Sequence, residues 1–301
     1  MPIAITPSRK CRKADVACDS TAQCSAATTT LQSAGDASAL AGCTTFTGSI
    51  AIATGTTDSI ALNGIQRVMG SVIANNVTQM TSLSGDSLTT IDDSFTLSSL
   101  TILSTLNFPR LENVQTIEWT ALPALQGLSF TTGVQQASIV SIQNTQLNTL
   151  DGIDLTSVDQ LTVANNNYLD AITMQLGNVS TSMILLANGR NVSASFPNLE
   201  WAYNMTLSNL TSISVPSLAS LNGSLGFYYN YFSELSTPNL TTVGGSLSLV
   251  SNDALTNLSM PELKTVTGGL TVSADTDLKT ITFPSLQTVG GALEFDGSFT
   301  K

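Results

Sequence analysis

Short groups of apolar residues recur along this chain at intervals of about 22 residues. The three C-terminal repeats share the pattern Pro-x-Leu-x-x-Val-Gly-Gly-x-Leu and begin at Pro238, Pro261 and Pro284. When the first apolar residue of each group is taken as a register mark, consecutive marks lie 20 to 23 residues apart. The twelve marks are Ile50, Val72, Phe95, Ile117, Ile139, Leu161, Met183, Met205, Leu225, Leu247, Leu270 and Leu293. So constant a period predicts a solenoid, in which each coil buries its apolar side against its neighbours.

Each mark opens a short strand in which apolar and small polar residues alternate, as in Leu247, Ser248 and Leu249. This alternation directs the first and third side chains inward and the second outward. The Gly-Gly pair supplies a tight turn before the strand, and the proline marks a corner because it cannot donate to an interior ladder. No coil shows a helical side, which disfavours a leucine-rich horseshoe. The predicted fold is all-β: a single-stranded parallel, right-handed β-helix of about 12 coils, roughly 50–55 Å long.

The outward positions of the strands form a flat stripe of mostly small, uncharged residues. The stripe consists of Ala51, Ile73, Thr96, Glu118, Val140, Thr162, Ile184, Thr206, Gly226, Ser248, Thr271 and Glu294. Its β-branched members Ile73, Val140 and Ile184 suit a contact face, and they equally suit ordinary strand propensity.

Asparagine recurs just after the strands. It occupies positions Asn76, Asn144, Asn166, Asn188, Asn209, Asn230 and Asn252. Stacked Asn side chains can satisfy buried backbone groups along a corner, and Asn also forms turns. Both structural roles are favoured here over a catalytic one.

The N-terminal cysteines predict a stapled cap. All four cysteines precede the second coil, which indicates disulfides at one end of a rod. Between Cys24 and Cys43, the pair Ser33 and Asp36 resembles a helix-capping signal. We therefore expect a short helix over the open end of the core, held by a Cys24–Cys43 disulfide.

Three segments follow from this reading. Residues 1–23 form an N-terminal tail, expected to be poorly ordered, in which a Cys11–Cys18 disulfide is a further candidate. Residues 24–47 form the cap and residues 48–301 the solenoid, and the two together make one domain.

Composition excludes some functions. Charged residues make up only 10% of the chain, against about 25% in ordinary domains. Four basic residues lie within positions 1–13, which leaves six basic and 21 acidic residues and a net charge of −15 for the remainder. Nucleic-acid binding is excluded because a phosphate backbone requires a basic face. The chain has no histidine, which argues against a zinc site.

Disulfides and sequons favour an extracellular location. The sequons lie at Asn76, Asn178, Asn191, Asn204, Asn209, Asn222, Asn239 and Asn257. Together with the disulfides, which point to the secretory route, they favour an N-glycosylated surface. No secretion signal or transmembrane run is visible, and the last coil lacks a closing cap. We therefore expect a fragment, or a gene model with misplaced ends.

The segment 31–50 carries a family resemblance. Its sequence, Leu-Gln-Ser-Ala-Gly-Asp-Ala-Ser-Ala-Leu-Ala-Gly-Cys-Thr-Thr-Phe-Thr-Gly-Ser-Ile, resembles the N-terminal cap of fungal GPI-anchored cell-wall organisation proteins. This is the extracellular-mutant and sporulation-specific group, which has receptor L-domain-like repeats. The Pro-x-Leu-x-x-Val-Gly-Gly-x-Leu coils resemble the same family, so the match covers about residues 24–298.

The resemblance implies a secreted glycoprotein of the fungal cell surface or cell wall. It would be held at the plasma membrane by a lipid anchor or linked to wall glucan, with a part in wall integrity and no enzymatic activity. The stalk and anchor signal of that family are not visible in this sequence, so contact with a membrane rests on the resemblance.

An enzyme is the competing interpretation, because parallel β-helices also carry polysaccharide lyases and hydrolases. Such chemistry needs paired carboxylates beside a cleft. The candidate pairs are Asp92 with Asp93, Asp151 with Asp154, and Asp275 with Asp277. Adjacent strand residues face opposite sides, the other pairs fall in turns, and the uniform coils leave no long loops to wall a cleft. We expect no catalytic residue, no metal site and no cofactor.

Aromatic residues cluster in two neighbouring coils. The candidates for ligand contact are Trp201, Tyr203, Tyr228, Tyr229 and Tyr231. Such rings can present a face to a sugar or a protein. The alternative is local packing around the short coil of 20 residues between Met205 and Leu225, with Phe227 and Phe232 nearby.

With the resemblance, the sequence predicts a non-catalytic extracellular glycoprotein that contributes to fungal cell-wall organisation and integrity. It would act as a scaffold that contacts glucan, chitin or wall proteins. The first alternative is a surface receptor or adhesion module for a protein ligand, and the second is a polysaccharide lyase or hydrolase.

Overall fold

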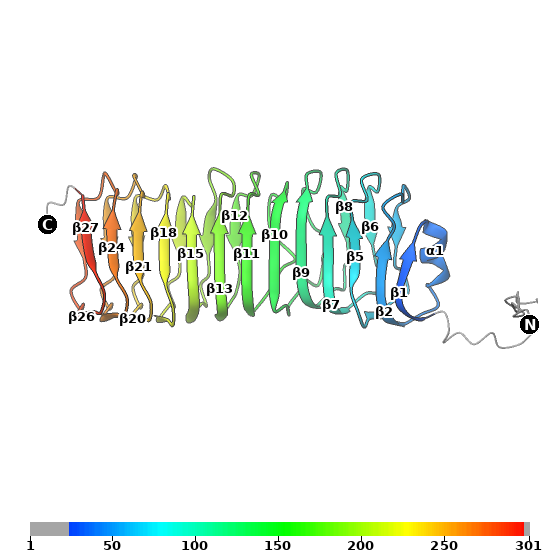
Figure 1. Ribbon diagram of the computed structural model, residues 1–301, viewed down its shortest axis with the longest axis horizontal. Helices are drawn as coiled ribbons and strands as arrows, with labels where there is room; N and C mark the ends of the chain where they lie inside the picture. The colour runs from blue at the N-terminus through cyan, green and yellow to red at the C-terminus, as the bar shows by residue number, and fades with distance from the viewer. Residues whose placement is uncertain (1–23, 298–301) are drawn as a thin grey trace, which may run out of the picture.

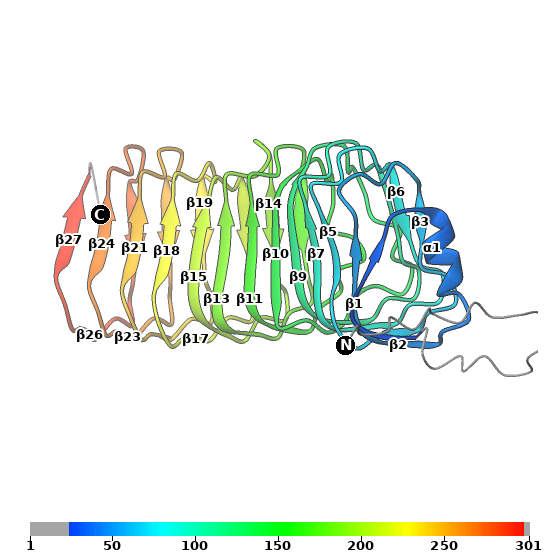
Figure 2. The same cartoon turned by 45° about the vertical axis from the view of Figure 1, so that its right-hand side comes forward.

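The chain folds into a parallel β-solenoid, which a computed structural model describes for residues 24–297. Strands of successive coils lie side by side along the rod, from β1 at one end to β27 at the other (Figure 1). The 18-stranded main sheet forms one long face, and three-stranded sheets lie on the opposite side of the coils (Figure 2). Every pairing between named strands is parallel, which confirms the predicted architecture of about 12 coils.

The main sheet contains one longer strand from each coil. These are β1 (Ser25–Leu31), β2 (Thr45–Ile52), β5 (Val72–Asn75), β7 (Thr90–Ser98), β9 (Asn113–Leu122), β10 (Ile139–Thr145), β11 (Ser157–Ala164), β13 (Asn178–Leu186), β15 (Trp201–Ser208), β18 (Leu225–Tyr228), β21 (Leu247–Val250), β24 (Leu270–Ser273) and β27 (Leu293–Asp296). Short strands extend the same sheet at β4 (Arg67–Val68), β17 (Ser220–Leu221), β20 (Thr242–Val243), β23 (Thr265–Val266) and β26 (Thr288–Val289).

Three small sheets close the opposite side of the coils. They are formed by β3 (Ile60–Ala61), β6 (Ser82–Ser84) and β8 (Thr105–Asn107); by β12 (Ala171–Thr173), β14 (Ser193–Ser195) and β16 (Ser212–Ser214); and by β19 (Glu234–Ser236), β22 (Asn257–Ser259) and β25 (Thr280–Thr282). Among the described residues, no helix is long and apolar enough to cross a membrane.

The predicted register is correct except in one coil. Leu225 pairs with Leu247, and Leu247 pairs with Leu270, as the marks require. In β10, however, Val140 rather than Ile139 pairs with Ile117 and Leu161. Val140 is fully buried, so its expected outward position is wrong and Ser141 faces outward instead. Two adjacent β-branched residues fit the pattern equally well, and the inward site is decided by stacking on the neighbouring coils.

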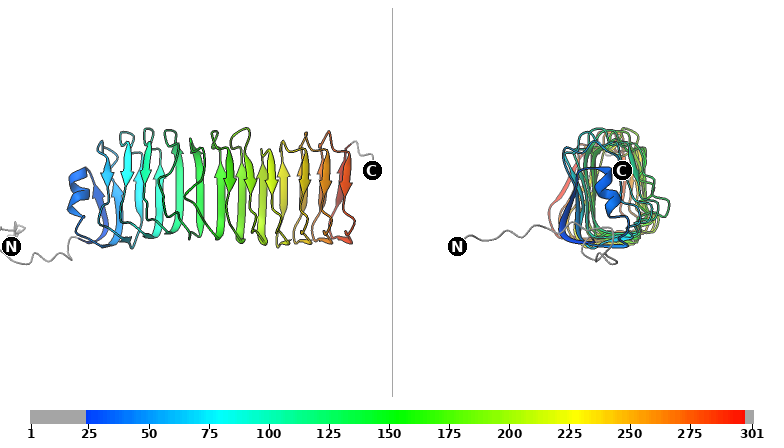
Figure 3. Two further views of the ribbon diagram at one scale, coloured as in Figure 1. Left: turned by 180° about the vertical axis from the view of Figure 1, so that it is seen from behind. Right: turned by 90° about the vertical axis from the view of Figure 1, so that its right-hand side faces the viewer.

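The N-terminal end is capped as predicted. Helix α1 (Ala34–Ala39) lies across the end of the solenoid (Figure 3). The Ser33 hydroxyl accepts from the Asp36 amide at 3.3 Å, and the Asp36 carboxylate accepts from the Gln32 and Ser33 amides. These hydrogen bonds lower the pKa of Asp36, and the bond from the Gln32 amide has the largest effect. The Cys24–Cys43 disulfide joins Cα atoms 5.6 Å apart.

The same region contains a strand that the pattern did not predict. Strand β1 pairs with β2 from Ser25 to Leu31 and so joins the cap to the main sheet. Its Ala and Thr residues provide little apolar alternation, since only Leu31 is fully buried. The predicted tail of residues 1–23, with Cys11 and Cys18, lies outside the described residues, as do residues 298–301.

Aromatic rings fill the interior of the coils near β7 and β9. Phe95 contacts Phe108 and Trp119 edge-to-face, with ring centroids 5.2 and 5.7 Å apart. Phe130 closes the group at 6.0 Å from both Phe108 and Trp119. Each edge-to-face pair stabilises the fold by about 0.5–1.5 kcal/mol in addition to the stabilisation that comes from burying the rings.

The recurring asparagines occupy two different positions at the corner after the strands. Asn76, Asn144 and Asn209 have positive φ angles of 56°, 54° and 61°, so they form the left-handed turn. The others, Asn166, Asn188, Asn230 and Asn252, are buried one residue beyond that turn. The sequence prediction is therefore confirmed for both structural roles, each for its own subset.

The buried asparagines form a ladder between coils. Oδ1 of Asn252 accepts from the Asn230 amide at 3.1 Å, and Nδ2 of Asn252 donates to the Phe227 carbonyl at 3.1 Å. Asn230 makes the same pair of bonds to Leu210 and Leu207. Each rung thus satisfies one N–H and one C=O that the corner leaves without a sheet partner.

The last rung of the ladder is Asp275. Its Oδ1 accepts from the amide and side chain of Asn252, at 2.6 and 3.0 Å, while its buried Oδ2 has no partner. Burial raises the pKa of this carboxyl, and the nearby Asp253 charge acts in the same direction. A neutral side chain therefore suits this position better than a carboxylate.

We expect Asn230→Ala to lower the free energy of unfolding by about 2–4 kcal/mol, because it leaves the Leu210 N–H and the Leu207 C=O buried without partners. Urea denaturation followed by circular dichroism measures the loss. Asn144→Ala is the matched control, since Asn144 lies exposed at the turn position, where Ala187 and Ala274 adopt the same positive φ. Equal losses in the two variants would contradict the ladder.

We expect Asp275→Asn to stabilise the protein at pH 7 and to have little effect below pH 3.8, the ordinary pKa of the group. In the parent, the carboxyl is protonated in both states at low pH, and stability falls as the pH rises through its raised pKa. Thermal unfolding of both proteins between pH 3 and pH 7 tests this. The variant should lose that part of the pH dependence, and a lower stability of the variant at pH 7 would refute it.

Candidate functional site

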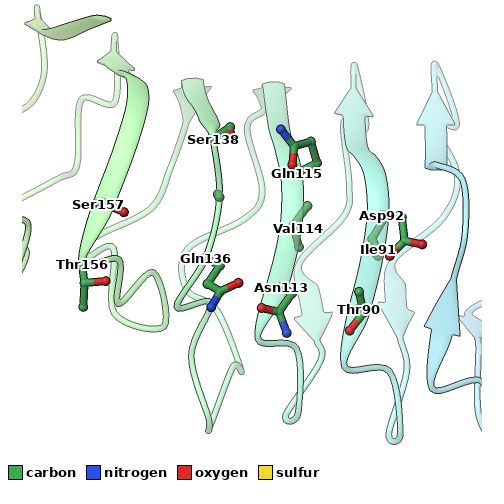
Figure 4. Close-up of a pocket in the computed structure, with 11 residues that line it drawn as sticks. Thr90, Ile91, Asp92, Asn113, Val114, Gln115, Gln136, Ser138, Thr156 and Ser157 are labelled. Carbon is green, nitrogen blue, oxygen red and sulfur yellow. The ribbon is translucent and has the colours of Figure 1, made fainter. Parts of the chain in front are cut away.

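A hollow of about 400 Å³ interrupts the outer face of the main sheet between β7 and β11. Its lining residues come from β7, from β9, from the segment 136–138 that precedes β10, and from the start of β11 (Figure 4). Its lining residues include Thr90, Asn113, Gln115, Gln136, Ser138 and Ser157. It is the strongest candidate for a binding site on the described surface.

The pairing of the strands aligns the side chains of this hollow. Thr90 pairs with Asn113, and Asn113 with Gln136, so the three residues form one row across the coils (Figure 4). At the next strands Ser157 pairs with Asn178, and Asn178 with Trp201. Side chains at equivalent positions are therefore presented at the spacing of the sheet, about 4.8 Å.

The hollow exists because β10 starts late. Strand β9 begins at Asn113, whereas β10 begins only at Ile139, and the residues before it make isolated bridges such as Asn113 with Gln136. Small side chains at Ala137 and Ser138 leave the space open. The segment 134–138 thus lies where the outer face of the main sheet is depressed.

The lining of the hollow is neutral and rich in free hydrogen-bonding groups. Its one charged residue is Asp92, which accepts three hydrogen bonds from Nε and Nη2 of Arg67 and forms an ion pair with it at 2.8 Å. This bonding raises the pKa of Arg67. The side-chain amides of Asn113, Gln115 and Gln136 have no hydrogen-bond partner within the described chain, so they remain available to a polar ligand.

A second hollow, of about 740 Å³, lies at the corner beyond β11 and β13. Tyr168, which is 59% exposed, lines it together with Asp170, Arg190 and Asn191. Asn191 belongs to a sequon, so a glycan attached there would occupy the same space.

Three of the candidate acids, Asp92, Asp93 and Asp275, have structural partners. Asp92 binds Arg67, whereas Asp93 accepts from the Ser71 hydroxyl at 2.8 Å. Asp275 belongs to the buried ladder. Within residues 24–297, no group of three or more His, Cys, Asp or Glu side chains gathers to bind a metal ion.

The predicted aromatic cluster divides into separate groups. Phe227 and Phe232 are buried and meet edge-to-face with centroids 6.1 Å apart. Trp201 and Tyr203 lie at the start of β15, and Tyr203 is 46% exposed. The pairing of Ser208 with Tyr228 places Tyr228 at the other end of that strand.

The tyrosines beyond β18 have different environments. The Tyr228 ring lies over Gly226, where an added Cβ would be 2.3 Å from it. Tyr229 and Tyr231 are 60% and 57% exposed at the following corner. Tyr228 is thus half-buried against its own strand, whereas Tyr229 and Tyr231 are more exposed, and ligand contact by these tyrosines stays a prediction.

None of the eight sequon asparagines is buried. Four are exposed, at Asn76, Asn191, Asn222 and Asn239, and four are half-buried, at Asn178, Asn204, Asn209 and Asn257. Only Asn76 precedes position 178, so β7 to β11 contain no sequon. The neutral hollow thus lies in a part of the rod without sites for N-linked glycan.

Sequence reasoning did not identify the residues of the hollow. Asn113, Gln115 and Gln136 lie before the apolar marks, where side-chain direction depends on bulges and on the start of each strand. Their only sequence signal was an accumulation of amide and hydroxyl residues ahead of three successive marks.

Together, the fold and this site define a disulfide-capped β-solenoid with a polar hollow on its main-sheet face. The comparisons agree with such a surface protein. The chain is 40% identical over 231 residues to "Protein ecm33" of Aspergillus fumigatus, which covers 76% of this chain and 58% of the relative. It is 31% identical over 237 residues to "Cell wall protein ecm33" of Schizosaccharomyces pombe, and 38% identical over 214 residues to "Cell wall mannoprotein PST1" of Saccharomyces cerevisiae.

The chain belongs to this family of fungal cell-surface, GPI-anchored cell-wall proteins, which confirms the resemblance. It is an extracellular protein of the cell wall by homology. The match covers 78% of this chain but 56% of the S. pombe relative, and 71% of this chain but 48% of PST1. No protein-family model and no solved structure matches the chain.

We expect N-linked glycan at Asn76, Asn191 and Asn222, because these sequon asparagines are exposed and their Nδ2 atoms make no hydrogen bond within the described chain. Peptide mass spectrometry after enzymatic deglycosylation in heavy-oxygen water measures their occupancy. Asn113, half-buried at the hollow and outside any sequon, is the unmodified control. Absence of glycan from all three asparagines would refute the expectation.

Proposed function

We propose that this protein is a non-catalytic scaffold of the fungal cell wall that contributes to wall organisation and integrity. The rod would contact wall polysaccharide, such as glucan or chitin, or wall proteins through its main-sheet face. The observation that carries this proposal is the regular solenoid itself, which offers a long lateral face and short turns.

Several features support a scaffold rather than an enzyme. Several relatives are named as cell-wall or cell-surface proteins, and none of the names is that of an enzyme. The candidate acids Asp92, Asp93 and Asp275 each have a structural partner. A glycosidase would need two carboxyl groups facing each other across the bound sugar, and the hollow contains one carboxylate, already paired.

A protein-binding role is the second candidate. Tyr229 and Tyr231 lie exposed at one corner, and tyrosine is enriched in protein interfaces because it buries a large area at low entropic cost. In that case the partner would be another wall protein, held by the corner rather than by the sheet face.

We expect the secreted protein to be retained on isolated fungal walls and to release no sugar from them. Retention is measured by co-sedimentation, and activity by the appearance of reducing ends and unsaturated products from glucan, chitin and whole walls. The unfolded, disulfide-reduced protein is the control for nonspecific adhesion.

The outcomes separate the alternatives. Release of reducing ends or unsaturated products would replace the scaffold with an enzyme. Capture of one wall protein, lost in Tyr229→Ala/Tyr231→Ala and independent of polysaccharide, would favour the adhesion module. Failure to bind walls at all would refute the proposal.

A further inference from the structure

We propose that the sheet hollow between β7 and β11 binds one linear, neutral polysaccharide chain, which lies across the strands and along the rod. This inference rests on the proposed scaffold function and names the ligand class of its face. Its central contacts are the amides of Asn113 and Gln136.

The geometry suits a chain molecule rather than a compact ligand. The row formed by Thr90, Asn113 and Gln136 crosses adjacent strands, and the hollow continues to Ser157 (Figure 4). Four strands span about 14 Å at the usual spacing. A strand repeat is close to the length of one pyranose unit, so successive sugars of an extended chain meet successive side chains.

The chemistry of the lining suits hydroxyl groups. An amide offers a donor and an acceptor, as a sugar hydroxyl does, and the three amides of the hollow are not used within the fold. Thr90, Ser138 and Ser157 add hydroxyls around them. The backbone groups of these strands stay hydrogen-bonded to the neighbouring strands, so only side chains would contact the sugar.

The charge of the lining and of the surrounding protein favours neutral polymers. The lining contains no free cation, since Arg67 outside it is paired with Asp92. The chain after position 13 has a net charge of −15, and a surface of that sign repels polyuronates and other anionic polymers. A neutral glucan or chitin-type chain encounters no such cost.

The sequon distribution keeps this surface open. Between Asn76 and Asn178 the sequence has no further sequon, and seven of the eight lie at or after Asn178. A glycan on Asn178 would stand beside Ser157, at the edge of the hollow. Glycans would therefore border the site without covering its amides.

The test compares two double variants that each remove one Asn and one Gln from adjacent coils. Asn113→Ala/Gln136→Ala removes the central amides of the hollow. Asn198→Ala/Gln175→Ala is the matched control, since its exposed amides bond each other at 2.8 Å outside the hollow. Circular dichroism and thermal unfolding verify that both variants fold.

Binding is measured by affinity electrophoresis in gels that contain soluble linear β-glucan, soluble chitin or polygalacturonate. We expect the parent and the control to bind a neutral polymer, the hollow variant to lose at least tenfold in affinity, and polygalacturonate to leave all three unretarded. Unchanged binding by the hollow variant, equal retardation by polygalacturonate, or no binding to either neutral polymer would overturn the inference.

Wall co-sedimentation of the same three proteins distinguishes failure of binding at the hollow from failure of the scaffold function. If the hollow variant and the parent are retained equally on walls, the scaffold role stands and the hollow is not its contact. If no protein is retained, the proposed function itself fails.

Discussion

The molecule depends on the register in which each coil hydrogen-bonds to the next. Inward and outward side chains alternate along each strand, so a slip of one residue would expose every buried residue of that coil. The stacking of Leu225, Leu247 and Leu270 illustrates how one coil positions its neighbours. Where coil lengths differ, as between Met205 and Leu225, the change is absorbed at the turns and the strand pairing continues. Stability is then nearly a sum over coils and their interfaces.

The corners of the coils contain backbone groups that the stacked strands leave without hydrogen-bond partners. A turn at a positive φ leaves the next amide pointing inward, where no strand can accept from it, and the buried asparagines accept instead. Leu210 occupies the position of a buried asparagine and has no polar side chain to join the ladder. In the same coil, Asn209 lies at the turn position, and its Oδ1 accepts from the Ala187 N–H. Asp275 occupies the same position with a carboxyl group in place of an amide, and one of its oxygens accepts hydrogen bonds while the other is buried without a partner.

Much of this fold could be predicted from the sequence because repetition averages out local ambiguity. Eleven strands of the main sheet follow the predicted marks, and the capping pair Ser33 and Asp36 with the Cys24–Cys43 disulfide predicts the end. The pattern fails where it is locally degenerate: Ile139 and Val140 are interchangeable to a periodicity argument, and β1 has almost no apolar residues. The aromatic cluster is separated in space because Trp201 and Tyr228 lie near opposite ends of the paired strands. The hollow escapes prediction for a related reason, since it arises from the late start of β10, which only the neighbouring strands reveal.

A regular solenoid restricts the ways in which it can recognise anything. With short turns and no enclosing loops, a ligand can be held only laterally, by a few small side chains from each coil. Specificity then comes from repetition: each additional coil that meets the ligand adds a similar weak contact, and a linear polymer can use many of them while a small molecule cannot. The neutral amides at Asn113 and Gln136 and the acidic surroundings fit such a polymer only if it is uncharged. Sequons gathered from Asn178 onward divide the rod further, because glycans there would keep neighbours away from one half and leave the face of β7 to β11 accessible. The same periodicity that forms the core therefore sets the spacing and the direction of the side chains that the surface presents to a ligand.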